Sequence, residues 1–126
     1  MNKRKILIID DEEGFSEMVK LNLESTDMYE VKVETDPRKA LHEAFLFQPD
    51  LILLDIIMAK KEGPEVAAEM KEDPILKKIP VIFLTATITQ KEVDEGDGIV
   101  GGHAFVAKPS GLNVLLRAIE RNLLLV

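Results

Sequence analysis

The sequence contains no cysteine and no tryptophan, and it has no long hydrophobic run. The absence of cysteine excludes disulfide bonds and thiolate metal sites. No stretch approaches the ~20 apolar residues that a membrane-spanning helix needs. The apolar run from Ile6 to Ile9, which follows the basic cluster Lys3-Arg4-Lys5, is too short for a signal peptide. We therefore expect a soluble cytoplasmic protein that does not enter a membrane.

Positive charge is also scarce. The chain has 16 lysines and arginines against 23 acidic residues, which gives a formal net charge of −7 at pH 7. No basic run is longer than three residues, so direct binding to nucleic acid is not expected. The 126 residues contain no linker, repeat or low-complexity segment. They predict a single domain over residues 1–126, without an appended output domain.

The apolar residues alternate between two patterns along the chain. Residues 5–9, 51–54, 81–84 and 104–107 are almost entirely apolar and predict strands buried on both faces of a sheet. Residues 29–35 alternate apolar with charged side chains, which predicts a half-exposed strand at an edge. Helical spacing predicts helices over about 15–25, 36–47, 64–72 and 110–123. This alternation favours an α/β fold with a parallel sheet covered by helices on both faces.

Two helices carry more detailed expectations. In the helix over 36–47, Ala40, Leu41, Ala44 and Phe45 are expected to face the core. A further short helix is expected to begin at Thr89, because residues 89–92 form a capping box. The glycine-rich stretch 96–102 should end that helix early.

Four of the predicted strands end in polar residues. Asp10 and Asp11 follow the first strand, Asp55 the third, Thr85 the fourth and Lys108 the fifth. The carboxyl ends of parallel strands share one edge, which is where open α/β sheets bind ligands. Neighbouring carboxylates repel one another, and a hard divalent cation would offset that repulsion. Oxygen-only ligands favour Mg²⁺, and Asp55 would then be a candidate nucleophile that forms an acyl phosphate.

This arrangement resembles the receiver domain of two-component response regulators, over the whole chain. The resemblance implies a flavodoxin-like (βα)5 fold, a doubly wound parallel sheet of five strands in the order 2-1-3-4-5. It implies that Asp55 is the phosphoacceptor and that Asp10, Asp11, Asp55 and the backbone carbonyl of Ile57 hold Mg²⁺. It implies that Asp55, Thr85 and Lys108 lie at the phosphoryl group. Thr85 and Phe105 would form the switch pair, and Lys108 would be followed by a cis Pro109.

The same resemblance implies the function and the partners. The chain would accept a phosphoryl group from a sensor histidine kinase or a phosphotransfer protein and change its partner-binding face. That face would consist of the fourth helix, the fifth strand and the fifth helix; it would bind a downstream protein and could support a phosphorylation-dependent dimer. Ile57 cannot orient a water molecule, so slow self-dephosphorylation is expected.

Two positions depart from the family pattern, and two other functions remain open. The family usually has proline where this chain has Ala59, and the glycine-rich stretch 96–102 is unusual. A magnesium-dependent phosphohydrolase would use similar residues, but it usually has a second acid at the position of Ile57 and a cap domain. A constitutive binding module could keep the fold without the chemistry. The acids Glu12 and Glu13, taken alone, fit the first turn of a helix.

Overall fold

The computed structural model describes residues 3–86, 99–100, 103–108 and 111–124. The expected short helix at Thr89 and the expected cis Pro109 fall outside these residues. The strands are β1 (Arg4–Ile9), β2 (Tyr29–Glu34), β3 (Leu51–Asp55), β4 (Val81–Thr85), β5 (Ile99–Val100) and β6 (His103–Ala107). The helices are α1 (Glu13–Glu24), α2 (Ala40–Phe47), α3 (Gly63–Lys71) and α5 (Leu112–Leu124), with short 3₁₀ turns η1 (Pro37–Lys39) and η2 (Leu76–Lys78).

The sheet has the order β2-β1-β3-β4-β6-β5. Its first five members are parallel, so the predicted five-stranded order 2-1-3-4-5 is confirmed, with β6 in the fifth place. The edge position of β2 is confirmed as well. The two-residue strand β5, which pairs antiparallel with β6, was not predicted. Two residues within a glycine-rich stretch are too few to show a strand period.

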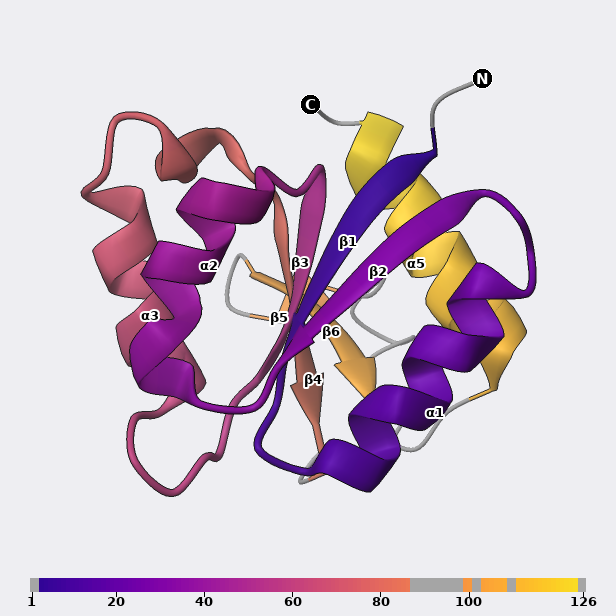
Figure 1. Cartoon of the computed structure of the whole chain (residues 1–126), viewed down its shortest axis with the longest axis horizontal. Coiled ribbons are helices and arrows are strands. Elements are labelled where there is room, and N and C mark those ends of the chain that lie inside the picture. The colour runs from indigo at the N-terminus through magenta and orange to yellow at the C-terminus, as the bar shows by residue number, and fades with distance from the viewer. Residues whose placement is uncertain (1–2, 87–98, 101–102, 109–110, 125–126) are drawn as a thin grey trace.

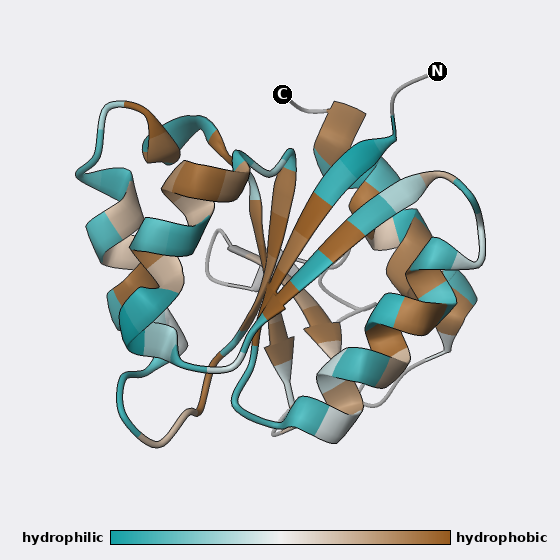
Figure 2. Cartoon of the chain, in the orientation of Figure 1, coloured by the Kyte–Doolittle hydropathy of each residue, from teal (hydrophilic) through white to brown (hydrophobic). Residues whose placement is uncertain are grey.

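Helices cover both faces of the sheet, α2 and α3 on one side and α1 and α5 on the other (Figure 1). Successive strand residues point to opposite faces. In β1, Ile6 and Ile8 pack with Leu115 and Ile119 of α5, while Leu7 and Ile9 pack into the cluster that contains Val66 of α3. Figure 2 shows the hydrophobic colour concentrated along the central strands and on the inner faces of the helices. This double burial explains why the central strands are apolar throughout.

The prediction that Phe45 faces the core was wrong. Phe45 is half exposed, whereas Ala40 and Ala44 are fully buried. Pro37–Lys39 form a 3₁₀ turn capped by the Asp36 carboxylate, and in the α-helix that follows the core face runs through Ala40, Ala44 and Phe47. Phe45 lies one residue, or about 100°, around the helix from the buried Ala44 and therefore lies off this face.

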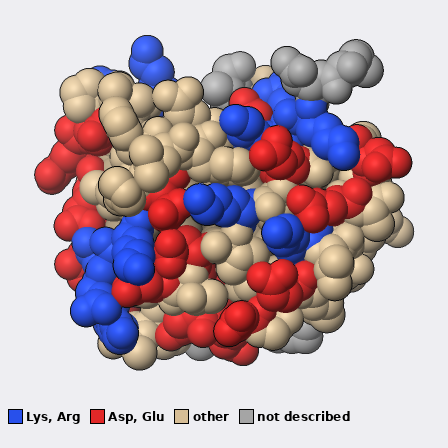
Figure 3. All heavy atoms as spheres, in the orientation of Figure 1, with Lys and Arg blue, Asp and Glu red and all other residues tan. Residues whose placement is uncertain are grey.

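The surface mixes charges of both signs. Figure 3 shows basic and acidic side chains interspersed over the face that it presents. Ion pairs such as Lys32–Glu43, with a nitrogen–oxygen distance of 2.6 Å, link some of these side chains. None of the described helices has the length and apolar character needed to cross a membrane.

Candidate functional site

The carboxyl ends of four neighbouring strands bring the predicted polar residues together. Sheet pairing sets Ile9 beside Leu54, Asp55 beside Leu84, and Thr85 beside Ala107. Each strand therefore ends at nearly the same level, and the residues at or just after these ends share one rim. The four site residues Asp10, Asp55, Thr85 and Lys108 are all buried. Their predicted convergence is confirmed.

Three carboxylates form the acidic part of this rim. One oxygen from each of Asp10, Asp11 and Asp55 lies within 4.8 Å of the others. Asp11 is exposed, and its Oδ2 accepts a 3.0 Å hydrogen bond from the backbone N–H of Ala59. A donor set made only of hard carboxylate oxygens fits Mg²⁺, which binds through one or two carboxylates and retains other oxygen ligands. These residues thus suit the ion that the sequence predicts.

Lys108 supplies the positive charge. Its Nζ donates to Asp10 Oδ2 at 2.9 Å and to Glu12 Oε1 at 2.7 Å, and it lies 3.5 Å from Asp55 Oδ2. The ammonium also lies 4.5 Å from the centre of the Phe15 ring, within cation–π range. The Lys108 backbone N–H donates to the carbonyl of Thr85 at 2.8 Å, which fixes the strand end that carries the lysine.

The protonation of the site follows from this geometry. Burial raises the pKa of the Asp55 carboxyl to about 6, and the neighbouring Asp10 charge acts in the same direction, while Lys108 opposes it. Burial lowers the pKa of Lys108, but its hydrogen bonds to Asp10 and Glu12 outweigh burial and hold the pKa above its usual range. The lysine therefore stays charged, and the charge on Asp55 is destabilised by its surroundings until a further cation binds.

A cavity of about 230 Å³ opens beside Asp55. The residues that line it are Glu12, Asp55, Ile56, Ile57, Thr85, Ala86 and Lys108. A water molecule occupies roughly 30 Å³ of liquid volume, so the cavity has the volume of several water molecules. This is enough space for a phosphoryl group next to the carboxylate. The cavity thus joins the acid, the hydroxyl-bearing residue and the ammonium. It also contains Ile57, whose side chain is 60% exposed.

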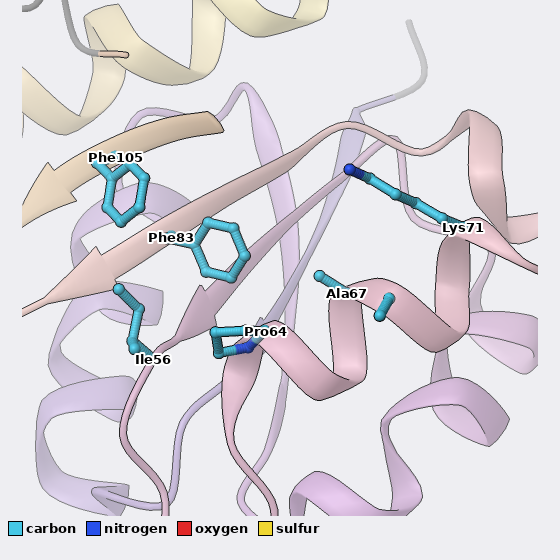
Figure 4. Close-up of a pocket in the computed structure, with 7 residues that line it drawn as sticks. Ile56, Pro64, Ala67, Lys71, Phe83 and Phe105 are labelled. Atoms are coloured by element: carbon cyan, nitrogen blue, oxygen red, sulfur yellow. The ribbon is translucent and has the colours of Figure 1, made fainter. Parts of the chain in front are cut away.

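The candidate switch aromatic lies on the far side of Ile56. The rings of Phe105 and Phe83 are 5.3 Å apart between centroids and inclined by 31°. Both line a second cavity, of about 260 Å³, which is mostly apolar and is bordered by Ile56 and by α3 residues including Pro64 and Ala67 (Figure 4). Phe105 is half-buried next to unfilled space, as a ring that changes position would require.

Gly63 holds the loop after β3 against the phosphoacceptor candidate. Its N–H donates to the carbonyl of Ile56 at 2.8 Å. A Cβ atom at this position would overlap the carbonyl oxygen of Asp55 and would lie 3.0 Å from Ile56 Cα. Only glycine allows this approach, because the neighbouring atoms are backbone and cannot rotate away.

Sequence reasoning missed three contributions to the site. Glu12 was interpreted only as an acid in the first helical turn, yet it binds Lys108. Ala59 was noted for its missing proline, yet its N–H holds Asp11, and a proline there would have no N–H to donate. Gly63 carried no signal beyond its place before a helix.

Comparisons with known proteins agree with this geometry. The sequence profile of the family described as "Response regulator receiver domain" matches residues 6–120. The alkaline phosphatase synthesis transcriptional regulatory protein PhoP of Bacillus subtilis (strain 168) is 34% identical over 125 residues, covering 96% of this chain and 50% of that protein. The chain thus spans about half the length of this relative.

Solved structures of response regulators have the same fold as this chain. The chemotaxis protein CheY4 of Vibrio cholerae is 28% identical, with a TM-score of 0.80 over 96% of this chain and 99% of that one. A putative response regulator from Chloroflexus aurantiacus J-10-fl shares the fold, with a TM-score of 0.82 at 24% identity, over 98% and 99% of the two chains.

Proposed function

This chain belongs to the response regulator receiver domain family, and on that premise we propose that Asp55 accepts a phosphoryl group from the phosphohistidine of a sensor histidine kinase or phosphotransfer protein. A carboxylate oxygen of Asp55 attacks phosphorus, the new O–P bond forms as the N–P bond breaks, and the histidine nitrogen leaves. The observation that carries the proposal is the position of Asp55, which lies in a cavity lined also by Lys108 and Thr85. Family membership makes the chain a signalling phosphoacceptor and not a phosphohydrolase.

Each neighbouring group has a defined part in the proposal. Lys108 neutralises a phosphoryl oxygen, and the Thr85 hydroxyl donates to another. Asp10, Asp11, Asp55 and the Ile57 carbonyl would hold Mg²⁺, which when bound supplies positive charge to the phosphoryl oxygens. The acids thus position the reacting groups, and catalysis is mainly orientation and charge stabilisation.

Phosphorylation would then act as a switch. Thr85 follows the phosphoryl group inward, and Phe105 moves into the space that this opens. The resulting population shift remodels the face made by β6, α5 and the helix expected to begin at Thr89, and this face binds a downstream protein or a second copy of the chain. The setting for this signalling is the cytoplasm, with proteins and not nucleic acid as direct partners.

Uptake of phosphate is the direct test. With Mg²⁺ and acetyl phosphate, the wild type should gain the mass of one phosphoryl group, and Asp55→Ala should gain none. Beryllofluoride, which imitates an acyl phosphate, should likewise bind only the wild type. An equal adduct on Asp55→Ala would assign phosphorylation to another residue, and no adduct on the wild type would favour a constitutive binding module.

The lifetime of the acyl phosphate is a second expectation. Ile57 lines the cavity and is 60% exposed, and its apolar side chain cannot orient an attacking water. Ile57→Asn adds a donor and an acceptor there, so we expect dephosphorylation to accelerate by roughly tenfold, less than the ~100-fold or more that a fully positioned proton-transfer group supplies. The decay of the phosphorylated mass after removal of acetyl phosphate measures it. Ile57→Val serves as the apolar control, and an unchanged half-life in Ile57→Asn would contradict the argument.

A further inference from the structure

Glu12 and the acids of the site compete for one ammonium group. Among the described residues, Lys108 Nζ donates to Asp10 Oδ2 and to Glu12 Oε1 at 2.9 and 2.7 Å, both within ordinary hydrogen-bond distance. Its 3.5 Å separation from Asp55 Oδ2 exceeds the usual range of such bonds. In this structure the lysine is therefore held more closely by Asp10 and Glu12 than by Asp55.

The two closer partners differ in how firmly they are fixed. Asp10 is fully buried, and its Oδ1 accepts a 2.9 Å hydrogen bond from the backbone N–H of Glu12. The Glu12 side chain, in contrast, is 64% exposed. It makes no capping hydrogen bond at the start of α1. Because Glu12 is open to solvent while Lys108 is buried, its carboxylate can exchange this contact for water more easily than Asp10 can.

We propose that Glu12 is a positioning residue that holds Lys108 back from Asp55 and so restrains phosphorylation until a phosphoryl oxygen displaces it. This inference rests on the proposed function of Asp55. When the phosphoryl group arrives, Lys108 turns toward it and the exposed carboxylate of Glu12 moves into solvent, while Asp10 keeps its place. Glu12 thus sets how readily Asp55 is phosphorylated, without contacting the phosphoryl group itself.

Three variants separate this contact from a general charge effect. Glu12→Gln keeps the length of the side chain and removes its charge. Glu12→Asp keeps the charge but shortens the side chain, so it no longer reaches the anchored lysine. Glu13→Gln is the matched control. Glu13 is the next residue and is also an exposed acid, so this substitution removes the same charge without touching Lys108's partner Glu12.

The first measurement observes the contact in the unphosphorylated protein. The ¹⁵Nζ resonance of Lys108, recorded without magnesium or phosphodonor, should shift in Glu12→Gln and Glu12→Asp and stay unchanged in Glu13→Gln. If both Glu12 variants leave this resonance in place, the ion pair is absent in solution and the inference fails.

The second measurement is the rate of phosphorylation by acetyl phosphate at saturating Mg²⁺. We expect both Glu12 variants to react faster than the wild type, by roughly two- to fivefold, the size of effect expected for an ion pair with one solvent-exposed partner. Glu13→Gln should change the rate much less. Equal acceleration in Glu12→Gln and Glu13→Gln, or a wild-type rate in Glu12→Asp, would mean that only charge matters and would overturn the role of Glu12.

The two proposals fail in different ways. If the wild type and all three variants accept phosphate at the same rate, the role of Asp55 stands and that of Glu12 is wrong. If the wild type accepts no phosphate from any donor, the function proposed for Asp55 fails and this inference fails with it. A slower reaction in Glu12→Gln would show that Glu12 assists phosphorylation, which reverses the proposal.

Discussion

Gly63→Ala should lower the free energy of unfolding by about 3 kcal/mol, at the upper end of the usual effect of overpacking. The added Cβ would overlap the carbonyl oxygen of Asp55, and the other close atoms also belong to the backbone of Asp55 and Ile56. Relief therefore requires movement of the β3–α3 loop, because no side chain can rotate out of the way. That loop carries the 2.8 Å hydrogen bond from Gly63 N–H to the Ile56 carbonyl, which the movement would weaken.

Thermal unfolding followed by circular dichroism measures this effect. For a domain of this size, about 3 kcal/mol corresponds to a fall in Tm of roughly 10 °C. Gly14→Ala is the matched control, because it makes the same change in helix α1 with no atom within 4 Å of the new Cβ. Alanine has the higher helix propensity, so this control should be neutral or slightly stabilising. If both variants unfold at the same temperature, the close approach at Gly63 is not a constraint.

Asp55→Asn should stabilise the magnesium-free protein at neutral pH. The pKa of Asp55 is raised to about 6, chiefly by burial and next by the charge of Asp10. A carboxyl with a raised pKa in the folded state binds its proton more tightly there than in the unfolded chain. Its stabilising contribution is complete below the unfolded pKa, near 4, and is lost as the pH rises through about 6. Asparagine is uncharged at every pH and can still donate to Asp10.

The expected difference follows from this sign. Well above pH 6, Asp55→Asn should exceed the wild type by about 3 kcal/mol in free energy of unfolding, and near pH 4 the two should converge. Urea unfolding between pH 4 and 8, with EDTA present, measures it. Added Mg²⁺ should stabilise the wild type more than the variant, because a ligand that binds the folded state shifts unfolding by mass action.

Asp36→Asn is a control in which the pKa shift, and therefore the expected change in stability, has the opposite sign. The hydrogen bonds from the side chain and backbone of Arg38 hold the pKa of Asp36 well below its usual range. A lowered pKa gives stability that is present above the unfolded pKa and is lost as the pH falls. Asp36→Asn should therefore weaken the protein slightly at neutral pH. If Asp55→Asn also weakens it there, or if its effect does not vary with pH, the charge on Asp55 is not destabilising.

The sequence by itself determined the arrangement of the sheet and the location of the site. Runs of apolar residues report burial on both faces, and the alternation of Val31 and Val33 with charged neighbours reports an edge strand. Parallel strands end on the same edge, so the sequence alone places Asp10, Asp55, Thr85 and Lys108 together. Both results follow from the periodicity of apolar residues and from chain direction, which the order of residues alone determines.

Only the tertiary structure decided which of these groups touch and what surrounds them. The ion pair between Glu12 and Lys108 joins residues 96 positions apart, and the approach of Gly63 to the Asp55 carbonyl depends on how one loop folds. The raised pKa of Asp55 likewise arises from burial and from the nearness of Asp10. Loop conformations and pairwise distances have no repeating pattern in sequence, because they depend on how separate elements pack. For that reason the sequence located the site, and only the folded chain showed how its charges are balanced.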